Sequence, residues 1–209
     1  MTAIAWDGKC VVVDSARSAS RNGTQRITIR KVRLFSKPIA LSRTSKVRFT
    51  ACVGAGMSKE IDGTYFLLDD VCTEEFGVRE WVEERKKYTG MAAHGVDLCN
   101  DFYLVGTDGD KPVMYRLNAL RSVDRLLTGS GASLLKHSTF DFMNQLDATD
   151  MAHAMTLVEA GTCGYPLIKY NPVTGKLTEI AKASDTKKRQ LKRMYVKVVM
   201  DLANKAFGE

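Results

Sequence analysis

The sequence predicts a layered α+β fold, in which antiparallel strands form sheets and helices cover their outer faces. Three observations lead to this prediction. Short strand-like segments separated by turn residues open the chain, a long amphipathic stretch follows them, and a second group of strands precedes a final helix. Strands that bury one face against each other, with helices segregated to the outside, form this class of architecture.

Length and composition indicate one compact globular unit. The chain has 209 residues, of which 44% are hydrophobic and 26% are charged, which is ordinary for a globular protein with a substantial core. We expect a single domain over residues 1–209 that ends in a basic helix at about 185–206. No apolar run approaches the ~18 residues of a membrane span, and the N-terminus lacks the apolar region of a signal peptide.

The first two strands form a predicted hairpin around the turn Asp7-Gly8-Lys9. A three-residue loop with a positive φ at its glycine pairs Trp6 with Cys10. Counting outward, Thr2 then faces Asp14, and directly opposed residues lie roughly 4.5–5.5 Å apart on one face. The hairpin would therefore carry a carboxylate to the end of the chain at which Thr2 lies. A surface hairpin whose ends are merely polar is the alternative.

Thr2 follows the initiator methionine directly, which gives it a possible chemistry of its own. Removal of Met1 would leave an α-amine on Thr2, and such an amine has an ordinary pKa of about 7.7–8.0. It can therefore take the hydroxyl proton near neutral pH, an arrangement known for threonine nucleophiles. A retained Met1 would turn the same nitrogen into an amide and block the site.

The middle of the chain alternates between strand and helix patterns. Ile27–Phe35 and Val47–Val53 read as strands, and the apolar spacing of Tyr65–Val82 predicts one or two helices. Two further strands flank Thr107-Asp108-Gly109-Asp110, which is a strong hairpin signal. Leu126–Thr128 is a strand that enters a Gly-Ser-Gly turn.

The last third contains helices around one more hairpin. Helices are predicted over residues 132–146 and 148–159, and Asp147 is the expected N-cap of the second. Strands at 165–170 and 176–180 are joined by a turn that contains Pro172 and Gly175. The basic C-terminal helix follows them.

The order of these elements resembles the proteasome β-subunits and their bacterial and phage relatives, the threonine-protease branch of the N-terminal nucleophile hydrolases. The resemblance rests on the hairpin that starts at Thr2, on the run Asp14-Ser15-Ala16-Arg17, on Lys31-Val32, on the strand that ends in Gly54-Ala55-Gly56, and on Gly129-Ser130-Gly131. It implies the four-layer αββα sandwich of that family.

The resemblance also implies roles for individual residues. Thr2 would be the nucleophile, Lys31 would favour its ionised hydroxyl, and Asp14 would hold Lys31 in place. The N–H group of Gly54 would stabilise the oxyanion, and Ser130 would orient the α-amine. Each has an alternative, because an Asp–Lys pair can be an ordinary ion pair, a glycine can serve a turn, and a serine can cap a helix.

Two points on these assignments stay open. Glu159 and Thr162 stand where the family has an aspartate and a serine, and Glu159 has the alternative of only ending a helix. Arg30 and Arg33 compete with Lys31 for the inward position, because a shift of one residue along a strand reverses the face on which a side chain lies.

The spacing of histidines and cysteines bears on metal and cofactor binding, and the state of the cysteines bears on cellular location. The histidines have no HExxH spacing and the cysteines have no CxxC spacing, so we expect no metal and no cofactor. Reduced, mostly buried thiols indicate a cytoplasmic protein. The cysteines are Cys10, Cys52, Cys72, Cys99 and Cys163.

Charge is unevenly distributed along the chain, whose formal net charge is +7. Residues 15–59 contain eleven Lys or Arg and no Asp or Glu, residues 60–84 contain nine acids and one Arg, and residues 182–205 contain eight bases and two acids. We interpret these blocks as solvated faces or as a subunit contact, in which the basic first third of one copy would meet the acidic stretch of the next. No nucleic-acid-binding motif accompanies them, so a nucleic-acid partner is not expected.

Two functions are consistent with the sequence. The first is a threonine hydrolase that cleaves peptide bonds in peptides or unfolded proteins, assembled into a ring or dimer, with or without an ATPase partner. The second is a catalytically inactive binding protein of the same fold. Such a protein, for example one encoded by a phage, would act on a host protein or nucleic acid. The joint presence of Thr2, Asp14 and Lys31 favours the first.

Overall fold

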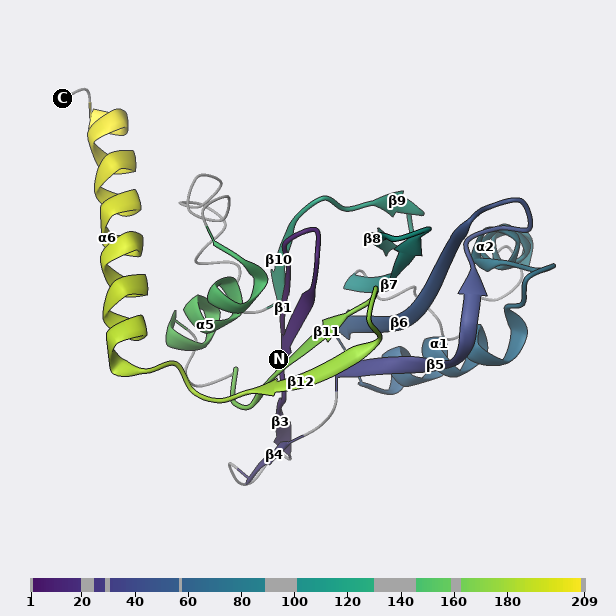
Figure 1. Ribbon diagram of the computed structural model, residues 1–209, viewed down its shortest axis with the longest axis horizontal. Coiled ribbons are helices and arrows are strands. Elements are labelled where there is room, and N and C mark those ends of the chain that lie inside the picture. Colours follow the sequence, from purple (N-terminus) through teal and green to yellow (C-terminus); the bar gives the residue numbers. More distant parts are fainter. Residues whose placement is uncertain are drawn as a thin grey trace.

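The computed structural model describes residues 2–19, 25–28, 31–56, 58–88, 101–129, 146–158 and 163–207 (Figure 1). The centre of this part of the chain consists of two antiparallel sheets, to which four helices are attached. Both strands of the N-terminal hairpin also pair with strands that lie far along the chain, so the first sheet brings this hairpin next to the last strands.

The first sheet contains both ends of the strand sequence. Its order is β10 (Leu126–Gly129), β1 (Ala3–Trp6), β2 (Val11–Asp14), β11 (Leu167–Asn171) and β12 (Lys176–Ile180). The predicted hairpin in the last third is confirmed as β11 and β12. Because β1 lies between β10 and β2, the segment that starts at Thr2 has a paired strand on each side.

The second sheet is formed by the middle of the chain. Its order is β5 (Val32–Ala40), β6 (Val47–Ala55), β7 (Asp101–Asp108), β8 (Lys111–Arg116) and β9 (Arg121–Ser122). The predicted turn between β7 and β8 is confirmed, with Gly109 at a φ of 59°. A separate two-stranded ribbon consists of β3 (Ala16–Ala19) and β4 (Gln25–Thr28).

The predicted register of the first hairpin is wrong by one residue. Trp6 pairs with Val11 rather than with Cys10. The reason is the side chain of Asp7, whose Oδ1 accepts hydrogen bonds from the backbone N–H groups of Lys9 and Cys10, both at 2.9 Å. This Asx-type turn keeps Cys10 in the loop. Asp14 therefore lies at the level of Ala3 rather than of Thr2.

The predicted single strand over Ile27–Phe35 is also wrong. Its first part belongs to β4, which pairs with β3, and its last part belongs to β5, which pairs with β6 in the second sheet. Lys31 lies just before β5, outside any strand. A pattern of alternating residues does not reveal that the chain changes sheets within it.

The helices are α1 (Ser58–Val71), α2 (Val78–Tyr88), α5 (Ala148–Val158) and α6 (Asp185–Phe207). The predicted amphipathic stretch thus forms two helices. Asp147 caps α5 as expected, because its Oδ1 accepts the N–H of Asp150 at 2.8 Å. The helix predicted over residues 132–146 lies largely outside the described residues.

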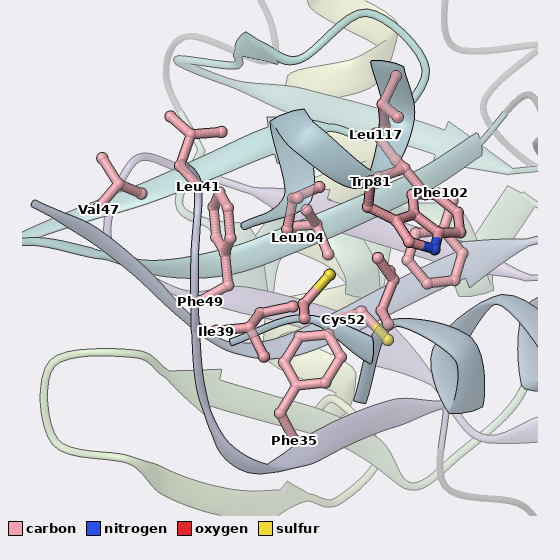
Figure 2. Packing of buried hydrophobic residues seen from close by; sticks show 14 of the residues in the cluster. Phe35, Ile39, Leu41, Val47, Phe49, Cys52, Trp81, Phe102, Leu104 and Leu117 are labelled. Atoms are coloured by element: carbon pink, nitrogen blue, oxygen red, sulfur yellow. The ribbon is translucent and has the colours of Figure 1, made fainter. Parts of the chain in front are cut away.

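Two of the three hydrophobic clusters lie between a sheet and helices. The first sheet packs against α5 and the first half of α6 through residues that include Met151, Met155 and Leu191. The second sheet packs against α1 and α2, with Phe49, Leu104 and Trp81 among the residues that Figure 2 shows. These contacts bury the apolar stripes of the helices.

The third cluster lies between the two sheets. It combines Ile4 and Val13 of the first sheet with Val53 and Tyr103 of the second, all of them buried. We call this space the inter-sheet core. Side chains alternate along a strand, so the position of Thr2, two residues before Ile4, faces this same space.

The expected four-layer αββα sandwich is a wrong description of this chain. The described residues form a sheet-rich fold of two antiparallel sheets with four helices. The helices do not build two matching layers, because only the first half of α6, the longest of them, packs against α5 and the first sheet. In Figure 1, α6 stands at one end of the long axis and projects from the body.

Within the described ranges, none of the helices combines the length and apolar character that crossing a bilayer requires.

Candidate active site

Thr2 lies directly before β1 and is almost completely buried, with an exposed fraction of 8%. The neighbouring strand holds it closely. Gly129 of β10 has a φ of 110°, and a Cβ atom at this position would lie 1.6 Å from the carbonyl oxygen of Thr2. Only glycine permits both this conformation and this approach. Gly129 therefore packs directly against the backbone of Thr2.

Asp14 at the end of β2 is fully buried and holds several parts of the chain together. Its Oδ1 accepts the backbone N–H of Ala3 at 2.7 Å. Its Oδ2 accepts the N–H of Gly164 at 3.3 Å, just before β11. Because the Ala3 nitrogen is bonded to the carbonyl carbon of Thr2, the carboxylate fixes the backbone directly after the candidate nucleophile.

Lys31 brings a positive charge to the same carboxylate. Its Nζ donates to Oδ1 of Asp14 at 2.7 Å, and its own exposed fraction is 5%. Burial lowers the pKa of the Lys31 ammonium, and the attraction of Asp14 opposes this effect. One oxygen atom thus bridges the lysine to the peptide nitrogen that follows Thr2.

The competition between Lys31 and the neighbouring arginines is partly decided. Arg33 points to the other side of the second sheet, where its guanidinium pairs with Asp62 of α1. Arg30 lies outside the described residues. Lys31 is therefore the basic residue of this segment that the structure brings to Asp14.

Gly54 has a packing reason to be glycine. It pairs with Phe102 on β7, and a Cβ atom on it would lie 3.0 Å from the Ile61 side chain of α1. This contact accounts for the residue without an oxyanion role. The other predicted site residues, Ser130, Glu159 and Thr162, lie outside the described residues.

Ser15 is a polar residue next to this site to which sequence reasoning gave no role. It is fully buried, and its backbone N–H donates to the carbonyl oxygen of Gly164 at 3.4 Å. Its Oγ has no hydrogen-bond partner among the described residues. If the register of β1 and β2 is continued by two residues, Ser15 lies opposite Thr2. A buried hydroxyl without a partner is uncommon and calls for an explanation.

A second set of hydrogen-bonded polar side chains links the two sheets close to Gly129. The Oγ1 of Thr128 donates to Oδ2 of Asp101 at 3.2 Å, and the hydroxyl of Tyr103 donates to Oδ1 of the same carboxylate at 3.2 Å. Burial, with the nearby charge of Asp101, raises the pKa of Tyr103 to about 12. Tyr103 is therefore a hydrogen-bond donor at neutral pH. The sequence contained no signal for this group, because Thr128 comes from β10 of the first sheet whereas Asp101 and Tyr103 come from β7 of the second.

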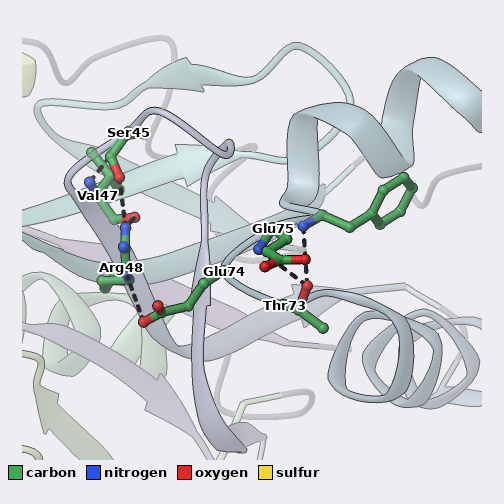
Figure 3. Close-up of polar contacts among 7 residues, drawn as sticks. Ser45, Val47, Arg48, Thr73, Glu74 and Glu75 are labelled. Atoms are coloured by element: carbon green, nitrogen blue, oxygen red, sulfur yellow. Dashed lines mark hydrogen bonds and ion pairs between the residues drawn. The ribbon is translucent and has the colours of Figure 1, made fainter.

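A cavity of about 610 Å³ lies elsewhere, where the loop between α1 and α2 meets β5 and β6 (Figure 3). Its lining contains none of Thr2, Asp14 and Lys31. Arg48 reaches across it, donating to the carbonyl of Ser45 at 2.6 Å and lying 3.9 Å from the exposed carboxylate of Glu74. These are solvent-exposed contacts, so size alone does not make this cavity the functional site. It is lined by Lys37, Pro38, Arg48, Thr73, Glu74 and Glu75.

Metal-binding side chains do not gather anywhere in the described ranges, in which no three His, Cys, Asp or Glu residues form a cluster. The cysteines at positions 10, 52, 72 and 163 are buried thiols.

Comparison with known proteins gives a likeness of fold. No family model matches the chain, and no curated protein matches it. Among solved structures, the chain is similar to Anbu from Hyphomicrobium sp. strain MC1, with 13% identity, coverage of 100% of this chain and 97% of that chain, and a TM-score of 0.52. It is also similar to Anbu from Yersinia bercovieri, described as an ancestral beta-subunit, with 16% identity, 97% coverage of both chains and a TM-score of 0.54.

These comparisons correct the resemblance drawn from the sequence. From its sequence, the chain was assigned to the threonine-peptidase branch that contains the proteasome β-subunits and their phage-encoded relatives. The structures that share its fold are instead Anbu proteins, and at this level of identity they show a proteasome-like fold and nothing finer. The assignment to that branch and to phage is therefore wrong.

Proposed function

We propose that this protein is a hydrolase that cleaves amide bonds in peptides or unfolded proteins through an acyl-enzyme on Thr2, after removal of Met1. The observation that carries the proposal is the buried bridge at the start of the chain. Oδ1 of Asp14 lies 2.7 Å from both the N–H nitrogen of Ala3 and the Nζ of Lys31. Burying two charges is costly, and here they lie beside a threonine at the chain start.

The reaction needs a base and a cation near the Thr2 hydroxyl. In the first step Oγ1 bonds to the substrate carbonyl carbon, its proton moves to the α-amine, and the carbonyl π electrons move to oxygen. Collapse of this intermediate breaks the C–N bond, and the leaving amine takes the proton. Water then attacks the ester and releases the acid, which restores Thr2.

Each neighbouring residue has a role in this proposal. The positive charge of Lys31 favours the ionised form of the Thr2 hydroxyl. Asp14 holds Lys31 and the backbone of Ala3 in a fixed relation. Ser15, with its unpartnered buried Oγ, would accept a hydrogen bond from the ammonium that forms on Thr2. Gly54 stays the proposed oxyanion donor and Ser130 the residue that orients the α-amine, and Glu159 and Thr162 stay candidates in place of the family's aspartate and serine.

The cellular location, the domain organisation and the self-association of the protein are part of the same proposal. We place the protein in the cytoplasm as one domain, because its described cysteines are buried thiols rather than disulfides. One similar structure is described as a beta-subunit, which supports self-association of this chain. An inactive binding protein of the same fold is the outcome that the following experiment would establish instead.

The proposal predicts covalent labelling at one residue. Purified protein should have lost the mass of Met1, and a β-lactone electrophile should then add one equivalent of mass to the peptide that begins with Thr2. Intact-mass and peptide mass spectrometry measure both changes. A Thr2→Ala variant is the control for labelling elsewhere. Protein that begins at Thr2 and forms no adduct would show that the fold serves binding rather than hydrolysis.

The role of Ser15 predicts a change in pH dependence. A hydroxyl that accepts from an ammonium stabilises the charged form and raises the pKa of the amine. Ser15→Ala should therefore move the rising limb of the kcat/KM profile to lower pH by about one unit, since a hydrogen bond to a charged group contributes ~1.5–3 kcal/mol and one unit is ~1.4 kcal/mol. Ser36→Ala, which removes an exposed hydroxyl bound to Asp69, is the matched control. An unchanged limb with reduced stability would assign Ser15 to structure alone.

A further inference from the structure

The second half of α6 carries an amphipathic surface that its own chain does not cover. Val196 and Met200, one helical turn apart, are exposed to 56% and 57%. Arg193 and Lys197 are exposed beside them, and neither forms an ion pair within the described residues. We call these four residues the α6 surface. Their spacing of i, i+3, i+4 and i+7 places them on one face of the helix.

A second exposed apolar surface lies on α1. Phe66, Leu67 and Val71 are exposed to 65%, 42% and 40%. Asp70 is exposed between them, and Gly63 on the preceding turn has no atom within 4 Å of the position its Cβ would take. We call residues 66, 67, 70 and 71 the α1 surface. Contiguous exposed apolar residues with a polar rim are typical of interaction sites.

The charges around the two surfaces are of opposite sign. The stretch from Glu60 to Glu84, which includes α1, contains nine acids and one arginine, and α6 lies in the basic block 182–205. A contact of α1 with α1, or of α6 with α6, would place like charges together. A contact of α1 with α6 places apolar residues together and surrounds them with opposite charges.

The two surfaces cannot meet within one molecule. Figure 1 shows α6 at one end of the long axis and α1 with α2 at the other, with both sheets between them. The first half of α6 is fixed on this side by Leu191 and Met194, which pack in the cluster around α5. Contact between the two surfaces therefore requires a second molecule.

The expectation that the acidic block meets the basic first third of the next copy is not favoured by the structure. Three basic residues of that third already pair within their own chain, Lys31 with Asp14, Arg33 with Asp62, and Arg48 with Glu74. Among the described residues, the bases of α6 that form ion pairs lie in its first turns. There Lys187 pairs with Asp150 and Lys188 with Asp185.

We propose that the α6 surface of one copy docks on the α1 surface of the next copy, head to tail. Val196 and Met200 pack against Phe66, Leu67 and Val71, and Arg193 and Lys197 lie near the acids of α1. A second copy fits both surfaces at once, whereas a nucleic acid would match the bases of α6 and leave its apolar residues and the whole α1 surface unused.

The contact is heterologous, because it joins two different patches. Copies joined in this way form a ring if the rotation closes and an open helical chain if it does not. A single helix-on-helix contact is smaller than the ~800 Å² per partner of a standard interface. Assembly should therefore depend on protein concentration, and salt should weaken it, because charges exposed at the rim are screened beyond ~10 Å at 0.1 M.

Light scattering after size-exclusion chromatography tests the assembly. The natural protein should elute at a multiple of its 23.2 kDa chain mass. An α6 variant with Val196→Asp and Met200→Asp, and an α1 variant with Phe66→Asp and Val71→Asp, should each elute at the monomer mass with an unchanged circular dichroism spectrum. Val173→Asp, at a residue exposed to 50% in the turn between β11 and β12, is the matched control and should assemble normally.

Mixing the two variants separates this contact from any other. Each variant keeps one intact surface, so a one-to-one mixture should form a species of twice the monomer mass and nothing larger. Assembly of either variant alone, or failure of the mixture to form this dimer, would overturn the proposal. A natural protein that is monomeric at high concentration and low salt would overturn it as well, whether or not Thr2 reacts.

Discussion

Replacement of Thr2 by alanine is expected to reduce peptide hydrolysis by about 10⁴-fold or more, with no change in fold. The substitution removes the only atom that forms the acyl-enzyme, and loss of a covalent nucleophile is among the largest single effects in enzymes. Alanine fits the site, because Thr2 is buried and the smaller side chain creates no clash. Release of a fluorescent group from a small peptide substrate measures the change.

Two matched proteins make this prediction specific. Thr2→Ser keeps a hydroxyl beside the α-amine and should retain part of the activity. The natural chain with a removable N-terminal tag should be inactive while the tag is attached and become active when cleavage exposes Thr2, because only then is the nitrogen an amine. Equal activity before and after cleavage would mean that the α-amine is not the base.

Local turn chemistry was the most predictable part of the fold. The hairpins of β7–β8 and β11–β12 were located from their turn residues, and the glycines in both turns have positive φ, at Gly109 and Gly175. Asp147 likewise caps α5 as its position predicts. These features depend on neighbouring residues, so the sequence reveals them directly.

The first hairpin shows where such reasoning fails. Its two strands were predicted, but its register was not, because the side chain of Asp7 binds two N–H groups and lengthens the loop by one residue. The same limit applies to Lys31. Only tertiary structure shows that the chain leaves β4 and enters the other sheet at this residue.

The polar environment of the candidate site was predictable only in part. The pairing of Asp14 with Lys31 was expected from the resemblance, and the structure contains it. The Ser15 hydroxyl, which has no hydrogen-bond partner among the described residues, was not expected, because Ser15 meets Gly164 from a distant part of the chain. The projection of α6 from the body could not be predicted either, since its amphipathic pattern does not reveal which element it packs on.

The Asp14–Lys31 pair changes one expectation about mutants. If the Lys31 charge acted only on the Thr2 hydroxyl, its loss would abolish activity and leave the fold intact. Both side chains are buried, with exposed fractions of 0% for Asp14 and 5% for Lys31. Removal of one partner leaves an uncompensated buried charge, which typically costs ~3–5 kcal/mol. Activity and stability are therefore linked at this pair.

We accordingly expect Lys31→Met to lower the free energy of unfolding by about 3–5 kcal/mol and to abolish turnover. Asp14→Asn should destabilise by a similar amount, because the carboxylate also accepts hydrogen bonds from Ala3 and Gly164. Urea unfolding followed by circular dichroism measures these changes. Arg33→Met, which breaks the more exposed pair with Asp62, is the control and should cost much less.

The double variant Lys31→Met with Asp14→Leu tests the physical cause. Apolar replacement of a whole buried pair is often neutral or stabilising, so the double variant should be more stable than either single variant, although two backbone N–H groups lose an acceptor. It should nevertheless stay inactive, because the charge beside Thr2 is absent. A double variant that hydrolyses peptides would show that the buried pair serves the fold alone, whereas strictly additive losses of stability would show that the two side chains do not interact.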